Sequence, residues 1–251
     1  MNKILKQIIP YWLGVKIRGN YQRLLALYLR GSKYTCPLCG NSFRKMLPGG
    51  IDNEVFKKYQ IIGGGRRPNS VCPRCFSTDR DRLVFLYLRD FTDVFQQRYE
   101  VLHIAPEGSL RAYFMNRTSV KYTAGFKDAN AYKGYYYNQV KQHIDITKTE
   151  FADNQFDFII CNHVLEHIED DLRAMHELYR IMKPGGRGIL QVPFAPILAH
   201  TIEGLSSPTP TDRLRLYGQE DHVRIYGTDY FERLKSVGFE VETFMLYRSN
   251  P

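Results

Sequence analysis

The segment from residue 156 to residue 193 constrains the fold of this chain more than any other. Phe156–Cys161 is a short, nearly continuous apolar run, typical of a parallel strand buried on both faces. Between residues 164 and 182, apolar side chains recur every three or four positions, with acids early and bases late. This pattern predicts an amphipathic helix. Lys-Pro-Gly-Gly at 183–186 ends the helix, and strand character resumes at 189–192. The order predicts a right-handed crossover in a parallel sheet, and therefore an α/β fold.

Three short sequences in this segment fall at a distinctive spacing. They are the strand end Cys161-Asn162-His163, the sequence VLEHI at 164–168, and LYRIMKPGG at 178–186. Together they resemble the fourth strand, the following helix and the entry to the fifth strand of class I S-adenosylmethionine-dependent methyltransferases, in the branch often labelled type 11. The resemblance extends over residues 101–242. It implies a doubly wound, seven-stranded Rossmann-like methyltransferase sheet that binds S-adenosylmethionine.

Two other interpretations fit parts of the same segment. Any doubly wound α/β protein has buried strands and similar Pro-Gly turns. The residues His163-x-x-Glu166-His167 also fit the inverted zinc-protease pattern, in which two histidines flank a glutamate. That pattern requires both histidines on one helix, whereas His163 is expected at a strand end. The methyltransferase resemblance accounts for more of the segment than either alternative.

Two CxxC sequences precede this region and are separated by 32 residues. Each presents two thiolates from one tight turn, and together they can complete a tetrahedral shell for a structural Zn²⁺. The predicted ligands are Cys36, Cys39, Cys72 and Cys75. Two disulfides or free thiols are the alternative, which a cytosolic setting disfavours. The fifth cysteine, Cys161, lies in a predicted core strand and is expected to be an inert apolar residue. The long spacer predicts an excursion with an exposed loop at its three consecutive glycines.

The excess positive charge belongs to the N-terminal part of the chain. Residues 1–51 contain nine Lys or Arg and no acid, whereas the rest has 26 of each sign, giving the net charge of +9. We expect a basic amphipathic helical segment at 1–31, interrupted at Gly19-Asn20, a zinc-ribbon-like module at 32–78 and a methyltransferase domain at 79–251. Residues 1–51 are candidates for contact with nucleic acid or an anionic membrane surface. No run is long enough to span a bilayer, so a cytoplasmic or membrane-peripheral location is expected.

The first turn of the domain departs from the family pattern. Val101–Ile104 is the predicted first strand, and the resemblance implies that an acid followed by a glycine-rich turn meets the methionine part of the cofactor. Here His103 replaces the acid and Ala105 replaces the first glycine. We expect His103, Ala105, Glu107 and Gly108 to form the cofactor turn, with Glu107 supplying the carboxylate. The eroded turn also fits a domain that has lost catalysis.

Three further residues are implied as cofactor ligands by the resemblance. Asp128 lies 20 residues after Gly108, at about the separation of a ribose-binding acid, although a solvated loop position is an equal alternative. Asp145 ends the predicted third strand, Val140–Ile146, where such methyltransferases place an acid on the adenine amino group. Its alternative role is a cap on the next turn. Asn162 ends the fourth strand and is expected to face the cofactor.

The acceptor side follows the fifth strand. His163 and His222 are the predicted catalytic bases, if a base is needed, because histidine accepts a proton near neutral pH. His222 and Arg224 could also bind the acceptor. The alternatives are a cofactor-rim role for His163 and a plain polar loop for His222 and Arg224. Asp229–Gly238 is the predicted last helix and Phe239–Tyr247 the closing strand. The expected reaction is direct methyl transfer to a small-molecule or saccharide acceptor. An RNA methyltransferase and an inactive binding protein are the competing functions.

Overall fold

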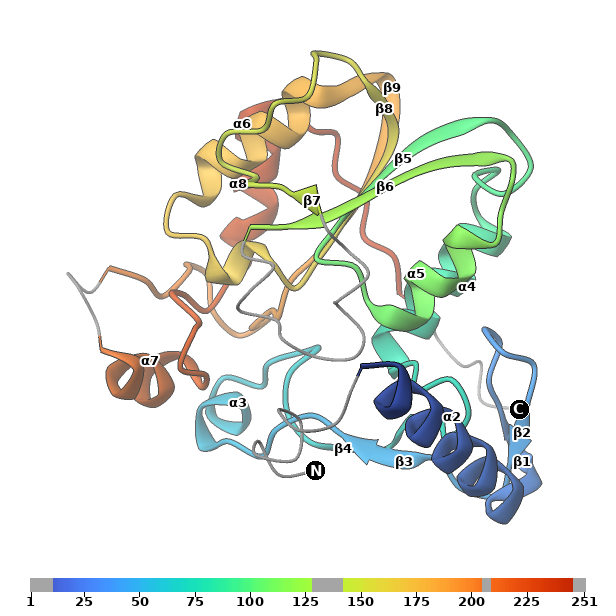
Figure 1. Ribbon diagram of the computed structural model, residues 1–251. Coiled ribbons are helices and arrows are strands. Elements are labelled where there is room, and N and C mark those ends of the chain that lie inside the picture. The colour runs from blue at the N-terminus through green and yellow to red at the C-terminus, as the bar shows by residue number, and fades with distance from the viewer. Residues whose placement is uncertain (1–10, 128–141, 205–208, 246–251) are drawn as a thin grey trace.

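The computed structural model describes residues 11–127, 142–204 and 209–245, and a five-stranded parallel sheet lies at the centre of that part of the chain (Figure 1). The strand order is β7-β6-β5-β8-β9, and all neighbouring pairs are parallel. The strands are β5 (Tyr99–Ile104), β6 (Val120–Phe126), β7 (Gln142–His143), β8 (Phe156–Asn162) and β9 (Met182–Gln191). The chain first builds outward from β5 and then returns to β8 on its other side. This reversal places a topological switch point, where such folds bind ligands, between β5 and β8.

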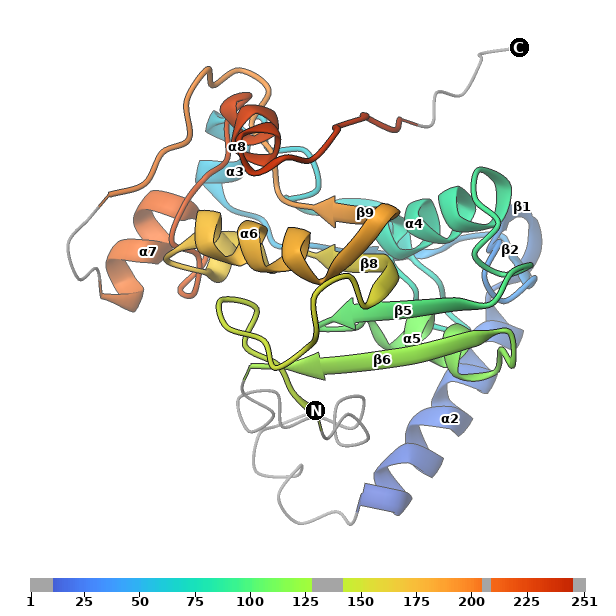
Figure 2. The same cartoon turned by 90° about the horizontal axis from the view of Figure 1, so that it is seen from above.

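Helices cover both faces of the sheet because the central strands are apolar on both sides. On one face, Leu102 and Ile159 pack with α6 (Asp171–Ile181) and α8 (Asp229–Val237). On the other face, Val101 and Phe158 pack with α4 (Asp79–Asp90) and α5 (Gly108–Met115). Figures 1 and 2 show the sheet between these two helix pairs. The predicted doubly wound α/β architecture is thus confirmed in three layers.

The N-terminal module is built from one long helix and two short pairs of antiparallel strands. Helix α2 (Tyr11–Tyr28) is followed by β1 (Arg30–Thr35), β2 (Ser42–Phe43), β3 (Leu47–Gly49) and β4 (Arg67–Val71). The β1–β2 and β3–β4 pairs are antiparallel. Contrary to the sequence prediction, α2 continues through Gly19-Asn20 without a break. A helix tolerates one internal glycine at a cost of about 1 kcal/mol.

The excursion between the two CxxC turns packs on the α/β domain. Short helix α3 (Glu54–Lys58) contributes Phe56 to an apolar cluster that includes Ala195 and Tyr217, the last residue of α7 (Pro210–Tyr217). Ile62 exchanges two backbone hydrogen bonds with Phe194, at 2.8 and 3.1 Å. The spacer is therefore an integral wall of the main domain, rather than only an exposed loop.

Two predicted elements differ in the structure. The helix expected from residue 164 begins only at Asp171, because the Asp170 carboxylate caps it by accepting from the Arg173 N–H. Residues Leu165–His167 form a separate 3₁₀ turn, η1. The helix ends at Ile181 as predicted, but the Lys-Pro-Gly-Gly sequence falls within the bounds of β9, at an irregular register against β8.

The predicted closing strand is not formed over residues 239–245, and the described residues contain five of the seven expected strands in the main sheet. Phe239 and Val241 pack against the core without pairing to a neighbouring strand. Phe244 packs on Tyr87 and Phe91 of the α4 region, with ring centroids 4.9 Å apart in each case. These three apolar side chains are therefore packed although the segment forms no strand over residues 239–245. Residues 140–141 and 246–247, which also belong to predicted strands, lie outside the described part.

Candidate functional site

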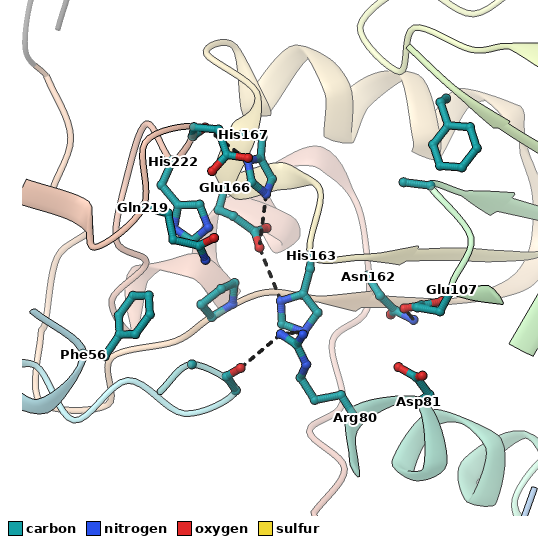
Figure 3. Close-up of a pocket in the computed structure, with 16 residues that line it drawn as sticks. Phe56, Arg80, Asp81, Glu107, Asn162, His163, Glu166, His167, Gln219 and His222 are labelled. Carbon is teal, nitrogen blue, oxygen red and sulfur yellow. Dashed lines mark hydrogen bonds and ion pairs between the residues drawn. The ribbon is translucent and has the colours of Figure 1, made fainter. Parts of the chain in front are cut away.

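A cleft of about 380 Å³ opens at the carboxyl ends of β5 and β8, at the switch point of the sheet (Figure 3). Its walls come from the domain and from the excursion of the N-terminal module. On the β5 side it is lined by Ala105, Glu107, Phe126 and Asn162. On the other side it is lined by Phe56, Gly63, Gly64, Arg80, Asp81, His163, Glu166, His167, Pro193, Gln219, Asp221 and His222. Its position matches the ligand site expected for an open parallel sheet.

Glu107 is held in the cleft by a chain of hydrogen bonds. Its Oε2 lies 2.8 Å from His103 Nε2, and its Oε1 accepts from Asn162 Nδ2 at 3.1 Å. His103 Nδ1 lies 2.9 Å from the hydroxyl of Tyr122, a phenol whose pKa is raised by burial. The Tyr122 hydroxyl therefore donates to His103, and the opposite ring N–H donates to Glu107. Burial opposes ionisation of Glu107, but these donors outweigh it and hold its pKa below the usual value.

Asn162 has a buried carbonyl oxygen without a hydrogen-bond partner, next to the Glu107 carboxylate. A buried acceptor of this kind calls for a donor from a ligand or water. The carboxylate and the amide oxygen together present acceptors to one cation with several N–H groups. His103 is itself fully buried and does not line the cleft. Its predicted direct contact with the cofactor is replaced by a supporting position behind Glu107.

Ala105 has the backbone conformation that a glycine-rich turn requires. Its φ is +47°, in the left-handed region that glycine adopts without cost and alanine does not. Its N–H donates to Gly125 O of β6 at 2.9 Å, which fixes the exit of the chain from β5. Gly108 follows as the first residue of α5. Ala105 therefore occupies a position whose backbone conformation favours glycine.

Asp145, another predicted cofactor ligand, is not among the residues that line the cleft. Asp145 accepts from the Thr147 N–H and hydroxyl and pairs with Lys127 at 2.9 Å. Burial opposes its ionisation, but Lys127 and Thr147 outweigh this and lower the pKa of Asp145 to about 2. The alternative role of Asp145 as a turn cap is therefore present in the structure. Asp128 lies outside the described residues.

His163 is fixed by two neighbours. Arg80 Nη1 lies 2.9 Å from His163 Nε2 and 3.0 Å from Gly63 O (Figure 3). Because a guanidinium only donates, Nε2 of His163 accepts and its Nδ1 carries the proton. That N–H faces Glu166 Oε1 at 3.3 Å. His163 has a φ of +53°, so it lies outside any helix and the inverted zinc-protease pattern is not realised.

His222 is buried beside His167, with ring centroids 4.8 Å apart. Burial is the main cause that lowers the pKa of His222 to about 4, so its ring is neutral near neutral pH. Arg224 does not reach the cleft. It is 4% exposed and donates to the carbonyl oxygens of Leu165 and Glu169 and to the carboxylate of Glu203. The idea that Arg224 binds an acceptor is therefore wrong, because its donors tie η1 to the loop after β9.

The four predicted metal ligands converge in the N-terminal module, and the described chain contains no disulfide. Cys36 Sγ lies 3.7 Å from Cys75 Sγ, and Cys39 Sγ lies 3.7 Å from Cys72 Sγ. Four thiolates around a tetrahedral Zn²⁺, with Zn–S near 2.3 Å, would be separated by about 3.8 Å. The two turns are also alike in backbone. Each first cysteine accepts through its carbonyl from the residue four positions later, at 2.8 and 3.0 Å.

Comparison with known proteins adds a family match over part of the chain. Residues 107–190 match the model of a methyltransferase domain, which is about a third of the chain. This match supports the resemblance to class I S-adenosylmethionine-dependent methyltransferases over that segment. It begins at Glu107 and includes Asn162, the two residues whose acceptors meet in the cleft.

Similarity to individual proteins is more limited. A demethylmenaquinone methyltransferase of Streptomyces avermitilis is 41% identical over 46 residues, which are 18% of this chain and 20% of that protein. A ubiquinone/menaquinone biosynthesis C-methyltransferase of Desulfotalea psychrophila is 40% identical over 43 residues, which are 17% and 18% of the two chains. This chain thus spans about a fifth of the length of these curated relatives.

Solved structures with partial similarity include two S-adenosylmethionine-dependent methyltransferases. The Archaeoglobus fulgidus protein is 16% identical, with a TM-score of 0.42 over 63% of this chain and 68% of that one. The Mesorhizobium loti protein is 14% identical, with a TM-score of 0.44 over 64% of this chain and 83% of that one.

None of the described helices combines the length and apolarity that a bilayer crossing needs.

Sequence reasoning missed several cleft residues. The sequence places Arg80 only in a bridging helix, although it follows the second CxxC turn closely. Phe56 and Gly63 belong to the spacer, which the sequence predicts only as an excursion with an exposed loop. Glu166 and His167 are part of the VLEHI sequence, but their burial in the cleft depends on η1 replacing the first helical turns. Only the protease-like spacing gives a signal for these two.

Proposed function

We propose that this protein is an S-adenosylmethionine-dependent methyltransferase that acts on a small-molecule or saccharide acceptor. The observation that carries the proposal is the pair of acceptors formed by Glu107 and Asn162 Oδ1 in the cleft at the switch point. These groups fit the ammonium of the cofactor's amino-acid part, in charge and in hydrogen-bonding capacity. Ala105 keeps the turn open to the cofactor, and Gly108 starts the helix behind it.

When bound, S-adenosylmethionine supplies an electrophilic methyl group on a sulfonium centre. The residues of this chain would act mainly by positioning the acceptor in line with that group and by excluding water. Glu107 and Asn162 hold the ammonium, and Asp145 and Asp128 remain the proposed contacts to the adenine and ribose. His163 and His222 lie on the acceptor side, where we propose that they contact the acceptor. Since His163 Nε2 accepts from Arg80 and burial lowers the pKa of His222, neither is a strong base in this arrangement.

The four cysteines are proposed to bind a structural Zn²⁺, which is supported by the two 3.7 Å Sγ–Sγ distances. All four thiolates would be used, so this ion has no open position for catalysis. Its effect on the site is indirect. The spacer between the CxxC turns supplies Phe56 and Gly63 to the cleft, and the second turn leads directly into α4, which carries Arg80.

The test of this function is calorimetric titration of S-adenosylmethionine into zinc-loaded protein, repeated with Asp145→Ala. Micromolar binding by the wild type, lost in the variant, would support both the cofactor and the predicted adenine contact. If the variant binds as tightly as the wild type, Asp145 serves only as a cap. If the well-folded wild type binds no cofactor, the enzyme proposal fails and a binding role on a methyltransferase scaffold takes its place.

For the N-terminal segment, we propose contact with an anionic membrane surface. Helix α2 exposes a set of large apolar side chains among its bases: Trp12, Tyr21, Leu24, Leu27 and Tyr28, each more than half exposed. A basic helix with exposed apolar groups suits a lipid headgroup surface. Co-sedimentation with vesicles containing phosphatidylglycerol tests this, with Leu24→Asp as the variant expected to release the protein. Equal sedimentation of both proteins, or preferential binding to RNA with steep loss in salt, would favour the nucleic-acid alternative.

A further inference from the structure

The acceptor side of the cleft contains a second group of side chains suited to a metal ion, apart from the four cysteines. We propose that Glu166, His167 and His222 bind a divalent first-row transition metal, which holds an oxygen of the methyl acceptor. Metal binding itself stands on the geometry alone. The role assigned to the metal rests on the proposed methyltransferase function.

The three side chains converge from two separate loops. Glu166 and His167 lie on η1, and His222 lies in the loop between α7 and α8. One ligand atom from each lies within 4.8 Å of the others, and Glu166 Oε1 is 3.9 Å from His167 Nε2. Nitrogen and oxygen ligands about 2.1 Å from a metal are separated by about 3.4 Å in a tetrahedral site, so each atom has to move by less than about 1 Å. The distance between the loops is bridged by the Val223 N–H, which donates to Glu166 O at 2.9 Å.

His167 is already oriented as a ligand. Its Nδ1 donates to the backbone oxygen of Asp221 at 3.1 Å, and its Nε2 lies 3.9 Å from Glu166 Oε1. Metal-binding histidines usually donate their second ring nitrogen in this way, to a carbonyl or carboxylate. His222 is buried, and no hydrogen bond holds either ring nitrogen within the described chain. Two imidazoles and one carboxylate form a donor set typical of Zn²⁺, Fe²⁺ or Mn²⁺ sites.

Glu166 supplies the independent observation that a ligand is needed. Its residue is 2% exposed, and its Oε2 is buried without a hydrogen-bond partner. Oε1 faces the N–H of His163, so only one of the two oxygens has a neighbouring donor. A buried carboxylate oxygen without a partner is costly unless a cation or water meets it. Among the described residues, no lysine or arginine donates a hydrogen bond to Glu166. A metal ion is therefore the cation that best matches this buried carboxylate.

The site faces the cleft, as a functional metal would require. All three side chains line it, on the side opposite to Glu107 and Asn162 (Figure 3). With three protein ligands, the ion keeps open positions toward the cleft, in contrast to the closed four-thiolate site. These positions suit oxygen ligands such as neighbouring hydroxyl groups of a saccharide. A metal-bound hydroxyl ionises more easily and releases its proton to water, so the acceptor would not require His163 or His222 as a base.

The test uses full-length protein whose cysteine site is first filled with Zn²⁺, followed by titration with Co²⁺. We expect one further Co²⁺ per chain, with the visible absorption of a nitrogen- and oxygen-ligated ion and without a thiolate charge-transfer band. His222→Gln and Glu166→Gln should each weaken Co²⁺ binding by about 100-fold or more, because removal of even a supporting residue costs 10- to 100-fold. The matched control is His176→Gln, which alters an exposed histidine of α6 and should leave Co²⁺ binding unchanged.

Several outcomes would overturn the proposal. These are the absence of Co²⁺ uptake by zinc-loaded protein, uptake only with a thiolate band, or equal binding by wild type and His222→Gln. If burial of the replaced groups prevents folding, His167→Gln provides a second variant, since its side chain is 25% exposed. Titration with S-adenosylmethionine separates this proposal from the enzymatic one. If the protein binds the cofactor but no Co²⁺, only the metal proposal fails. If it binds Co²⁺ but no cofactor, the methyltransferase proposal fails and the metal site is retained.

Discussion

Replacement of Glu107 by glutamine tests the cofactor site more directly than any other change. The carboxylate lines the cleft and is prearranged there, because His103 Nε2 and Asn162 Nδ2 hold its two oxygens at 2.8 and 3.1 Å. A hydrogen bond to a charged group contributes about 1.5–3 kcal/mol. Since 1.4 kcal/mol corresponds to a factor of ten, Glu107→Gln should weaken S-adenosylmethionine binding by about 10- to 100-fold.

The variant should fold, because the supporting network can be satisfied again. The amide oxygen of the introduced glutamine accepts from His103, and a rotated Asn162 side chain offers its oxygen to the introduced NH₂ group. Titration calorimetry of wild type and variant gives the ratio of dissociation constants, and thermal unfolding checks the fold. Because donors hold the pKa of Glu107 below its usual value, the carboxylate stays ionised and wild-type affinity should not fall on its account between neutral pH and about pH 5.

A ligand without the amino-acid part provides the decisive control. Methylthioadenosine has no ammonium, so its affinity should be the same for wild type and Glu107→Gln. Equal weakening of both ligands would mean that the substitution distorts the cleft as a whole. Unchanged affinity for S-adenosylmethionine would show that Glu107 does not meet the ammonium, and the reasoning from the Glu107–Asn162 pair would be refuted.

Three further changes test other parts of the molecule. Ala105→Gly should raise the free energy of unfolding by up to about 1 kcal/mol in urea titrations and Ala105→Val should lower it, because only glycine adopts a φ of +47° without cost. Cys72→Ser should release bound zinc to a chromogenic chelator and lower the thermal midpoint, whereas Cys161→Ala should retain the ion. Glu177→Gln should destabilise by about 1 kcal/mol at neutral pH. Since Arg180 is the main cause that lowers the pKa of Glu177 from 4.5 to about 2, this difference should shrink as the pH falls from about 4.5 toward 2. A difference that persists at acid pH would contradict it.

The central α/β unit was predictable because its signals are local and redundant. Apolar periodicity over residues 156–192 specifies a strand, a helix and a strand, and burial on both faces requires helices on each side. The CxxC spacing likewise predicts that four thiols meet, since each turn is short and the chemistry of the thiolates is specific. In both cases, residues close together in the sequence are sufficient to predict the structure, and the long-range contacts are consistent with that prediction.

The details of the site depend on contacts that no local pattern contains. Nothing in the sequence near residue 163 indicates that His163 takes a left-handed φ or that η1 separates it from α6. That break turns Glu166 and His167 into the cleft, where His222 meets them from more than 50 residues away. The prediction of two catalytic bases treated each histidine alone. The hydrogen bond from Arg80 decides which ring nitrogen of His163 accepts, and the Asp221 carbonyl does the same for the neighbouring His167.

The closing strand shows the opposite failure, in which a correct local pattern leads to a wrong element. Phe239 and Val241 alternate with Glu240 and Glu242 as in a half-buried strand, and Phe244 follows out of that phase. They do pack inward, but the backbone around them pairs with no strand in the described chain. Alternation reports which side chains are buried and leaves the ladder partner unspecified.

The spacer between the CxxC turns links the two halves of the protein in a way that bears on specificity. A zinc module that only stabilised the N-terminus would need no contact with the cleft. Instead, the spacer pairs with Phe194 after β9 and places Phe56 and Gly63 on the acceptor side. A Cβ on Gly63 would lie 3.5 Å from the His163 ring, so this wall is already in van der Waals contact distance of the site. The shape of this side of the cleft therefore depends on the fold of the cysteine module. If the proposed Zn²⁺ is bound there, its removal should affect binding of the proposed acceptor more than binding of the cofactor, because Asn162 ends a central strand of the sheet and Glu107 is hydrogen-bonded to it.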